Sequence, residues 1–187
     1  MFYHASSVKD IKTLEPRISN HDIPLIYFSE KRENVLVYLS NAVEKFCKET
    51  GFYYSGVWHK WASYGFDKDG ILNLEEYYPN ALIDTYKGVS GYIYSAENVN
   101  NSGDIINVPY AVTSREKVEI SGCEFIMDAY KEIIKAEENG LIRITRYESL
   151  SEAKLKWIAD TMKREYEEAS EHPEYRYFIE NKFGVRN

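Results

Sequence analysis

Short apolar and aromatic runs along the chain predict a series of strands. Three runs are nearly continuous and predict buried strands, whereas the others alternate apolar with polar residues and predict strands with one solvated face. The predicted strands cover residues 2–6, 24–28, 91–96, 117–120, 124–126 and 141–147. The predicted strands 117–120 and 124–126 lie on either side of Ser121-Gly122, which predicts a hairpin.

A helical pattern follows the second predicted strand. Leu36, Leu39, Val43, Phe46 and Cys47 recur at three- and four-residue spacing and predict a single buried face. We expect this helix to begin at an N-cap serine, to run to about residue 49 and to end at the glycine that follows; these two flanking residues are Ser29 and Gly51.

Two further helices are predicted nearer the C-terminus. One begins after Asp128 and stops at Gly140. The other is a long amphipathic helix behind the capping-box pair Ser149 and Glu152. The residues after His172-Pro173 predict a short turn or helix, and the aromatic stretch 52–91 predicts turns and short strands.

Composition predicts one globular domain, residues 1–187. The 44% apolar and 28% charged residues are typical of folded proteins, and a chain of 187 residues can bury a substantial core. Cys47 and Cys123 lie in apolar stretches, so we expect two buried free thiols. The chain shows no secretory leader and no run of eighteen apolar residues, which predicts a cytoplasmic protein without membrane contact.

The net charge of −7 disfavours nucleic acid as a partner, because that surface requires concentrated positive charge. Residues 65–76 are similar to a calcium-binding loop, but Gly65 replaces the first carboxylate, so an ordinary turn at 67–70 is favoured. The histidines and cysteines do not have metal-ligand spacing, so no metal is expected. Trp58, His59 and Trp61 fit a recognition cage less well than a core or cleft wall.

A small set of polar and aromatic residues stands out from this background. His4 and Ser6 lie on the first predicted strand, Tyr27 lies near the end of the second, and Tyr38 follows eleven residues later. Such groups suit a ribose hydroxyl and a flat ring, because the hydroxyl needs hydrogen-bond partners and the ring gains from stacking.

In its motifs the chain resembles the ADP-ribosyltransferases of the His-Tyr-Glu type, which include poly(ADP-ribose) polymerases and diphtheria-toxin-like enzymes. The family's His-Gly-Ser run corresponds to His4-Ala5-Ser6, its Tyr-Phe-Ala strand end corresponds to Tyr27-Phe28-Ser29, and its second tyrosine corresponds to Tyr38. Together with the predicted elements, the resemblance implies an α+β fold with a mixed, largely antiparallel split β-sheet core, flanking helices and a long C-terminal amphipathic helix.

The resemblance also implies NAD as co-substrate and a role for each matching residue. His4 would donate a hydrogen bond to a ribose hydroxyl, Ser6 would bind the nicotinamide carboxamide, and Tyr27 and Tyr38 would sandwich the nicotinamide ring. Ala5 stands where the family has glycine, so its methyl group would crowd the carboxamide.

The family's glutamate, which stabilises the oxocarbenium-like charge as nicotinamide leaves, has three candidates here. Glu116 opens the predicted strand 117–120, and in the family the carboxylate commonly lies at such a strand entrance. Glu119 and Glu124 are the alternatives, and the context of Glu124 resembles a Glu-Tyr-Ile sequence of some polymerases.

Two function classes follow. The first is an NAD-dependent ADP-ribosyltransferase, with His4 and Glu116 as catalytic residues, that transfers ADP-ribose to an acceptor the sequence does not identify. The second is a catalytically inactive α+β domain that binds a small ligand or another protein.

Overall fold

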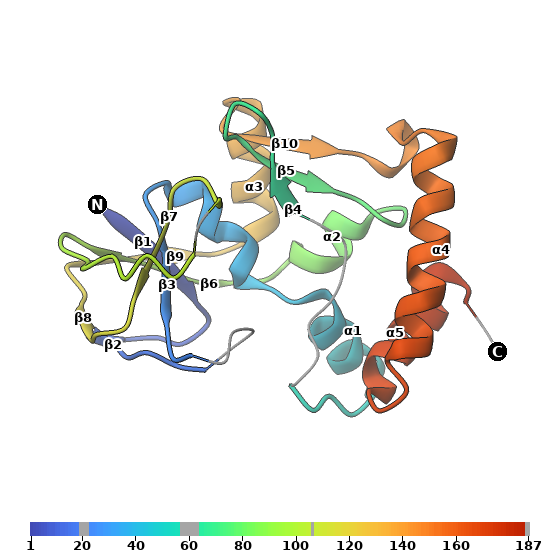
Figure 1. Cartoon of the computed structure of the whole chain (residues 1–187), viewed down its shortest axis with the longest axis horizontal. Helices are drawn as coiled ribbons and strands as arrows, with labels where there is room; N and C mark the ends of the chain where they lie inside the picture. The colour runs from blue at the N-terminus through green and yellow to red at the C-terminus, as the bar shows by residue number, and fades with distance from the viewer. Residues whose placement is uncertain (19–22, 57–63, 106, 186–187) are drawn as a thin grey trace. The chain divides into compact units, whose positions relative to one another are not determined.

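The computed structural model describes residues 1–18, 23–56, 64–105 and 107–185 (Figure 1). The predicted cluster of Trp58, His59 and Trp61 lies outside the described residues. With 37% helix, 24% strand and mostly antiparallel sheets, the chain has the predicted α+β class. A search of the described helices finds none with the length and apolar character needed to cross a bilayer.

The main sheet has five strands in the order β7-β3-β1-β6-β9, and every neighbouring pair is antiparallel. Its strands are β1 (Phe2–Ser6), β3 (Ile26–Ser29), β6 (Gly91–Ala96), β7 (Ala111–Ser114) and β9 (Gly122–Ile126). The predicted strands at 2–6, 24–28, 91–96 and 124–126 are therefore confirmed. β7 was not predicted, because its four residues show neither alternation nor a long apolar run.

Two smaller sheets complete the strands. One pairs β2 (Thr13–Leu14) with β8 (Val118–Glu119), and the other has the order β10-β5-β4, made of Ile142–Thr145, Leu72–Glu75 and Tyr64–Phe66. The predicted turn at 67–70 is confirmed, since the Gly70 amide donates to the Asp67 carbonyl at 3.0 Å. The predicted hairpin around Ser121 is wrong, because β8 pairs with β2 whereas β9 pairs with β6.

The single helix predicted after Ser29 is in fact two helices. The Ser29 hydroxyl accepts from the Lys31 amide in a local turn, and a 3-10 helix, η1 (Arg32–Leu39), follows. Asn41 then caps a separate helix, α1 (Ala42–Thr50), by accepting from the amides of Val43 and Glu44. Gly51, in the left-handed conformation, ends α1 as predicted.

The chain forms two compact units, and its path changes unit between η1 and α1. Unit 1 consists of Met1–Leu39, Phe66–Leu72 and Gly88–Ile142, and unit 2 consists of Ser40–Gly65, Asn73–Lys87 and Arg143–Asn187. This division explains the wrong helix prediction: Leu36 and Leu39 are buried in unit 1, whereas Val43 and Cys47 are buried in unit 2.

Both faces of the five-stranded sheet of unit 1 are covered by other elements of the same unit. On one face, η1 packs against β1, β3 and β6, and α3 (Ala129–Glu138) packs against η1. On the other face, the β2 and β8 pair contributes to an apolar cluster, which consists of Leu14, Ile26, Phe28, Ala96, Val112 and Val118. Asp128 caps α3 as predicted, by accepting from the Lys131 amide.

Unit 2 is mainly helical. It contains α1, α2 (Ala81–Tyr86), α4 (Glu152–Glu168) and α5 (Pro173–Phe183), with the short η2 (Tyr147–Ser149) before α4. The predicted long helix is confirmed, but its cap is Ser151, which accepts from the Lys154 amide, and not Ser149. The core of the unit includes Cys47, Tyr78, Ile158, Met162, Tyr166, Tyr175 and Phe178.

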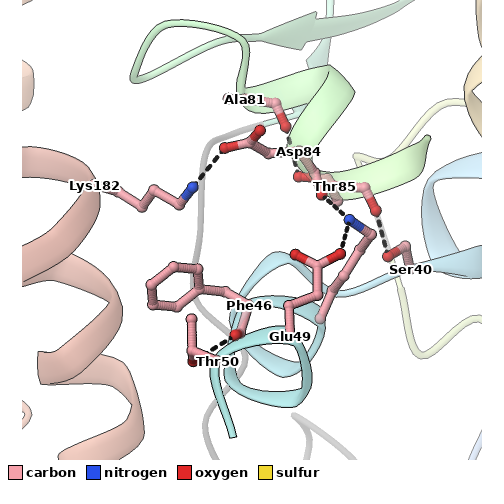
Figure 2. A network of polar contacts seen from close by, with 9 residues as sticks. Ser40, Phe46, Glu49, Thr50, Ala81, Asp84, Thr85 and Lys182 are labelled. Atoms are coloured by element: carbon pink, nitrogen blue, oxygen red, sulfur yellow. Dashed lines mark hydrogen bonds and ion pairs between the residues drawn. The ribbon is translucent and has the colours of Figure 1, made fainter. Parts of the chain in front are cut away.

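Polar contacts connect three helices of unit 2. Figure 2 shows Lys182 of α5 pointing toward Asp84 of α2, with 2.6 Å between the ammonium and the carboxylate. Lys45 of α1 donates to the Asp84 carbonyl and to Glu49. The Lys182 ammonium also lies 4.9 Å from the Phe46 ring centroid, so an ion pair and a cation–π contact both hold α5 to its neighbours.

Candidate functional site

The candidate site residues of unit 1 lie on two faces of one sheet. His4 and Ser6 are directly opposite Tyr94 and Tyr92, so these four side chains share a face. Tyr3 points to the opposite face together with its partner Ser29. Since side chains alternate along a strand, Tyr27 shares the face of Ser29 and not that of His4.

The face of Tyr27 is the face that η1 covers. Two contacts fix this arrangement: Arg32 of η1 bonds to Glu124, which is opposite Ile93, and a Cβ on Gly91 would lie 2.6 Å from a methyl of Leu39. Tyr38 lies on η1 and its side chain is 56% exposed. The structure therefore brings Tyr27 and the helix of Tyr38 to one face, and His4 and Ser6 to the other.

The two faces meet where β1 and β3 separate. Among the described residues, these strands pair only at Tyr3 and Ser29, whereas β1 pairs with β6 at each of its five residues. Beyond Tyr3, the strands are bridged by a side chain, because His4 Nδ1 lies 2.9 Å from the Tyr27 carbonyl oxygen. β1 and β3 are therefore not paired beside His4-Ala5-Ser6, and we call this place the β1–β3 split.

Backbone groups line both sides of the β1–β3 split. In an antiparallel sheet the N–H and C=O of one residue point to the same edge, and those of the next residue to the other. Leu25 and Arg17 exchange two backbone bonds of 3.0 and 3.2 Å, and the Tyr27 carbonyl meets His4 on this same edge. On β1, the pairing of Tyr3 with Ser29 directs the polar groups of Ala5 toward β3.

The bond to Tyr27 fixes the tautomer of the neutral His4 ring. A carbonyl oxygen can only accept, so Nδ1 must carry the proton and donate to Tyr27, which leaves Nε2 as an acceptor. Burial lowers the pKa of His4 below its ordinary 6.5; the bond to Tyr27 raises it by less, and the nearby charge of Arg17 lowers it further. The ring also lies 5.9 Å from that of Phe28.

Ser6 is held at the end of β1. Its hydroxyl oxygen accepts from the Val8 amide at 3.1 Å, which starts the turn that leaves the strand. The hydroxyl hydrogen can still donate to a ligand, because accepting one bond does not consume it.

The three candidate glutamates lie in different surroundings. Glu116 does not open a strand, since β8 begins at Val118; it is exposed in the turn after β7, where its amide donates to Ser114 Oγ and its carbonyl accepts from that hydroxyl. Glu119 accepts from the Thr13 hydroxyl at 2.9 Å. Glu124 lies on β9, two strands from β1.

Arg32 binds both carboxylate oxygens of Glu124. Its guanidinium donates to both carboxylate oxygens, at 2.7 and 2.6 Å, and this pairing lowers the pKa of Glu124. The turn that carries Glu116 follows Ser114, the residue opposite Ile26 at the start of β3. Glu116 therefore follows the strand next to β3, whereas Glu124 is level with Ala5 but lies on β9, which β6 separates from β1.

Sequence reasoning missed two features of this region. Arg17 lies outside the predicted strands and helices, and its approach to His4 depends on a pairing with Leu25 that local spacing does not encode. The bridge from His4 to a main-chain oxygen also has no signature in side-chain identity. Pro24 precedes Leu25, and Leu25 begins the apolar run 25–28. These two features were the only sequence signals near the pairing of Arg17 with Leu25.

A separate hollow lies on the β8 surface and is lined by Glu97, Asn98 and residues 117–121. It includes Glu119 but none of His4, Ser6, Tyr27 or Tyr38. No group of three potential metal ligands occurs among the residues that the structure describes. Comparison with protein-family models, curated proteins and solved structures finds no match to this chain.

Proposed function

We propose that unit 1 binds NAD with its nicotinamide end at the β1–β3 split and acts as an ADP-ribosyltransferase of the His-Tyr-Glu kind. The observation that carries this proposal is the separation of β1 from β3 directly beside His4-Ala5-Ser6, with the His4 ring joined to the backbone of Tyr27. His4 and the backbone of Tyr27 thus meet although 23 positions separate them, which supports this proposal.

The backbone of Ala5 suits a carboxamide. Its N–H and C=O point toward β3, and a primary amide offers the matching acceptor and donor in one plane. Ser6 would add a hydroxyl donor at the end of the strand. Because the amide contacts use the main chain, the Ala5 methyl group can remain on the η1 face.

His4 would contact a ribose hydroxyl by accepting a hydrogen bond from it at Nε2. The sequence suggested that His4 donates, but the bond to Tyr27 uses the only ring proton of the neutral imidazole. Arg17 adds positive charge near His4, which favours an anionic ligand such as a dinucleotide.

Tyr27 and Tyr38 would supply the aromatic walls. Tyr27 shares the sheet face that η1 covers and Tyr38 is on η1, so we expect both rings on that side of the split. A desolvated aromatic slot favours a planar ring by stacking. Glu116 would supply the carboxylate for the developing oxocarbenium charge, because Glu124 is held by Arg32 and Glu119 by Thr13.

Nicotinamide release tests this proposal. Purified protein incubated with NAD should release nicotinamide, and NAD should raise the melting temperature. Tyr38→Ala should lose both effects, while the matched variant Tyr53→Ala, at an exposed tyrosine of unit 2, should keep them. Absence of both nicotinamide release and thermal stabilisation in the natural protein contradicts the proposal.

A second candidate is an NAD-binding module without turnover. The composition of the strands at the split favours it: β1, β3 and β7 carry no Asp or Glu, so no strand residue there supplies a catalytic carboxylate. Calorimetry separates the two candidates: NAD that binds without nicotinamide release supports the module. If Glu116→Gln abolishes release but preserves binding, the enzyme is supported, with Glu97→Gln as the exposed control.

A further inference from the structure

The two outer edges of the five-stranded sheet are treated differently. At the β7 edge, the Thr113 carbonyl accepts from the Ser102 amide at 2.8 Å, and the Thr113 amide donates to the side chain of Asn101 at 3.4 Å. The 101–104 loop therefore covers this edge and satisfies its outward polar groups.

The β9 edge has no such cover. Ser95 of β6 accepts from the Ser121 amide and is opposite Gly122, so Gly122, Glu124 and Ile126 direct their polar groups toward β6. The N–H and C=O groups of Cys123 and Phe125 consequently point outward. Within the described part of the chain, no residue bonds to them on this side.

The side chains along this edge are mostly apolar and exposed. Phe125 is 55% exposed and Met127 is 78% exposed, and Cys123, predicted to be buried, is an exposed free thiol because it lies on the outermost strand. The Phe125 ring packs against that of Tyr92 at 5.3 Å. An open edge with large apolar side chains is a site for strand pairing.

Charge does not protect this edge. Glu124 is the one ionisable carboxylate within β9, and Arg32 of the same chain already binds both of its oxygens. The Arg32 guanidinium also contacts Glu132 at 3.2 Å. A second copy can therefore approach the β9 edge without bringing two unpaired carboxylates together, despite the overall charge of −7.

We infer that β9 pairs with β9 of a second copy of this chain, antiparallel and centred on Phe125. Only residues with outward polar groups can be opposite each other in hydrogen-bonded pairs, so the centre must be chosen among a few registers. A centre at Glu124 would place two like charges opposite each other, which is unfavourable.

A centre at Phe125 is the best alternative for an apolar contact. It places Phe125 opposite Phe125 of the second copy, Glu124 opposite Ile126, and Cys123 opposite Met127. The two Phe125 rings would be flanked by the two Tyr92 rings on one face, which gives a self-complementary interface with two-fold symmetry. A centre at Cys123 would bring Phe125 opposite Ser121 and lose this contact.

Sedimentation velocity over a range of concentrations tests the inference with the full chain. The natural protein should form dimers, and Phe125→Lys should weaken dimerisation by on the order of tenfold or more, because each dimer loses two aromatic contacts. Tyr53→Lys, at a 77% exposed tyrosine of unit 2, is the matched control and should dimerise normally.

Disulfide trapping tests the register. Met127 directly follows β9, and extending the pairing by this one residue places it opposite Cys123. Met127→Cys should therefore form a disulfide with Cys123 of the second copy under mild oxidation, since directly opposite residues of paired strands have suitable Cα separation. The double variant Cys123→Ser, Met127→Cys should not form this bond. The inference is overturned if the protein stays monomeric, if Phe125→Lys leaves the dimer intact, or if the dimer does not form the 123–127 disulfide. It is also overturned if the β9 edge binds only peptides of other proteins while the chain stays monomeric.

Discussion

The half-buried imidazole of His4 bridges β1 to β3 and makes the stability of unit 1 depend on pH. Because burial depresses the pKa of His4 in the folded state, the unfolded chain binds the proton more readily. The stabilising contribution is complete above the ordinary value of 6.5, and it is lost as the pH falls below 6.5 toward the lower folded-state pKa. Protonation would not remove the donor at Nδ1, so the loss comes from burying charge.

His4→Asn should therefore reduce the pH dependence. The asparagine amide can still donate to the Tyr27 carbonyl, but it does not titrate. Urea unfolding at pH 7.5 and at pH 5 should show a smaller difference for the variant than for the natural protein. Equal differences in the two proteins would mean that His4 is not buried in its neutral form.

At this scale the sequence predicts residue character better than residue partners. The helix-ending role of Gly51 and the capping role of Asp128 followed from local rules, because each acts on its own next turn. The exposure of Cys123 did not, because it depends on which strand lies outermost in the sheet. His4 was selected for a ligand contact, yet its ring bonds to the main-chain oxygen of Tyr27.

The packing of η1 on the sheet depends on a glycine. A Cβ on Gly91 would lie 2.6 Å from Leu39 Cδ2 and 3.1 Å from the Ser6 carbonyl oxygen, so a methyl group there must displace the buried Leu39 side chain and crowd the β1 backbone. Gly91→Ala should destabilise the protein by about 1–3 kcal/mol in chemical unfolding. Gly65→Ala, in a strand position with no atom within 4 Å, is the control and should change stability little.

A buried carboxylate holds α2 and η2 in place. Glu76 is 6% exposed; one oxygen accepts from the Leu82 amide at 3.0 Å and the other from the Tyr147 amide at 3.3 Å. Glu76→Gln should cost about 1–3 kcal/mol, because one side-chain donor would then face a backbone donor. In the same unfolding assay, Glu75→Gln should have a smaller effect, and an equal effect would contradict the assigned role.

Element predictions from the sequence succeeded where one hydrophobic pattern corresponds to one helix or strand. Four strands of the main sheet and the C-terminal helices were recovered in this way. The helix predicted over 29–49 failed, because its apolar spacing continues across a change of unit at Ser40 and Asn41. The hairpin predicted at 117–126 failed as well, since β8 and β9 find their partners more than twenty-five residues away.

At the scale of the whole molecule, the sequence predicted the α+β class and the motif residues but not their arrangement. The order β7-β3-β1-β6-β9 depends on pairings between distant segments, which no local pattern contains. The placement of Tyr27 and His4 on opposite faces, with the β1–β3 split between them, follows from that order and from the single pairing of Tyr3 with Ser29.

The division into two units makes ligand binding testable across the chain. If NAD occupies the β1–β3 split, backbone amides of β1, β3 and η1 should exchange hydrogen more slowly in its presence, whereas amides of α4 and α5 should be unaffected. At a ligand concentration about ten times Kd, exchange that requires opening of the site should slow by about tenfold. Mass spectrometry of hydrogen exchange measures both units in one experiment. Protection of α4 and α5 without β1 and β3 would place the ligand in unit 2 and contradict the proposed site, while nicotinamide alone should protect the amides nearest Ala5 and Tyr27.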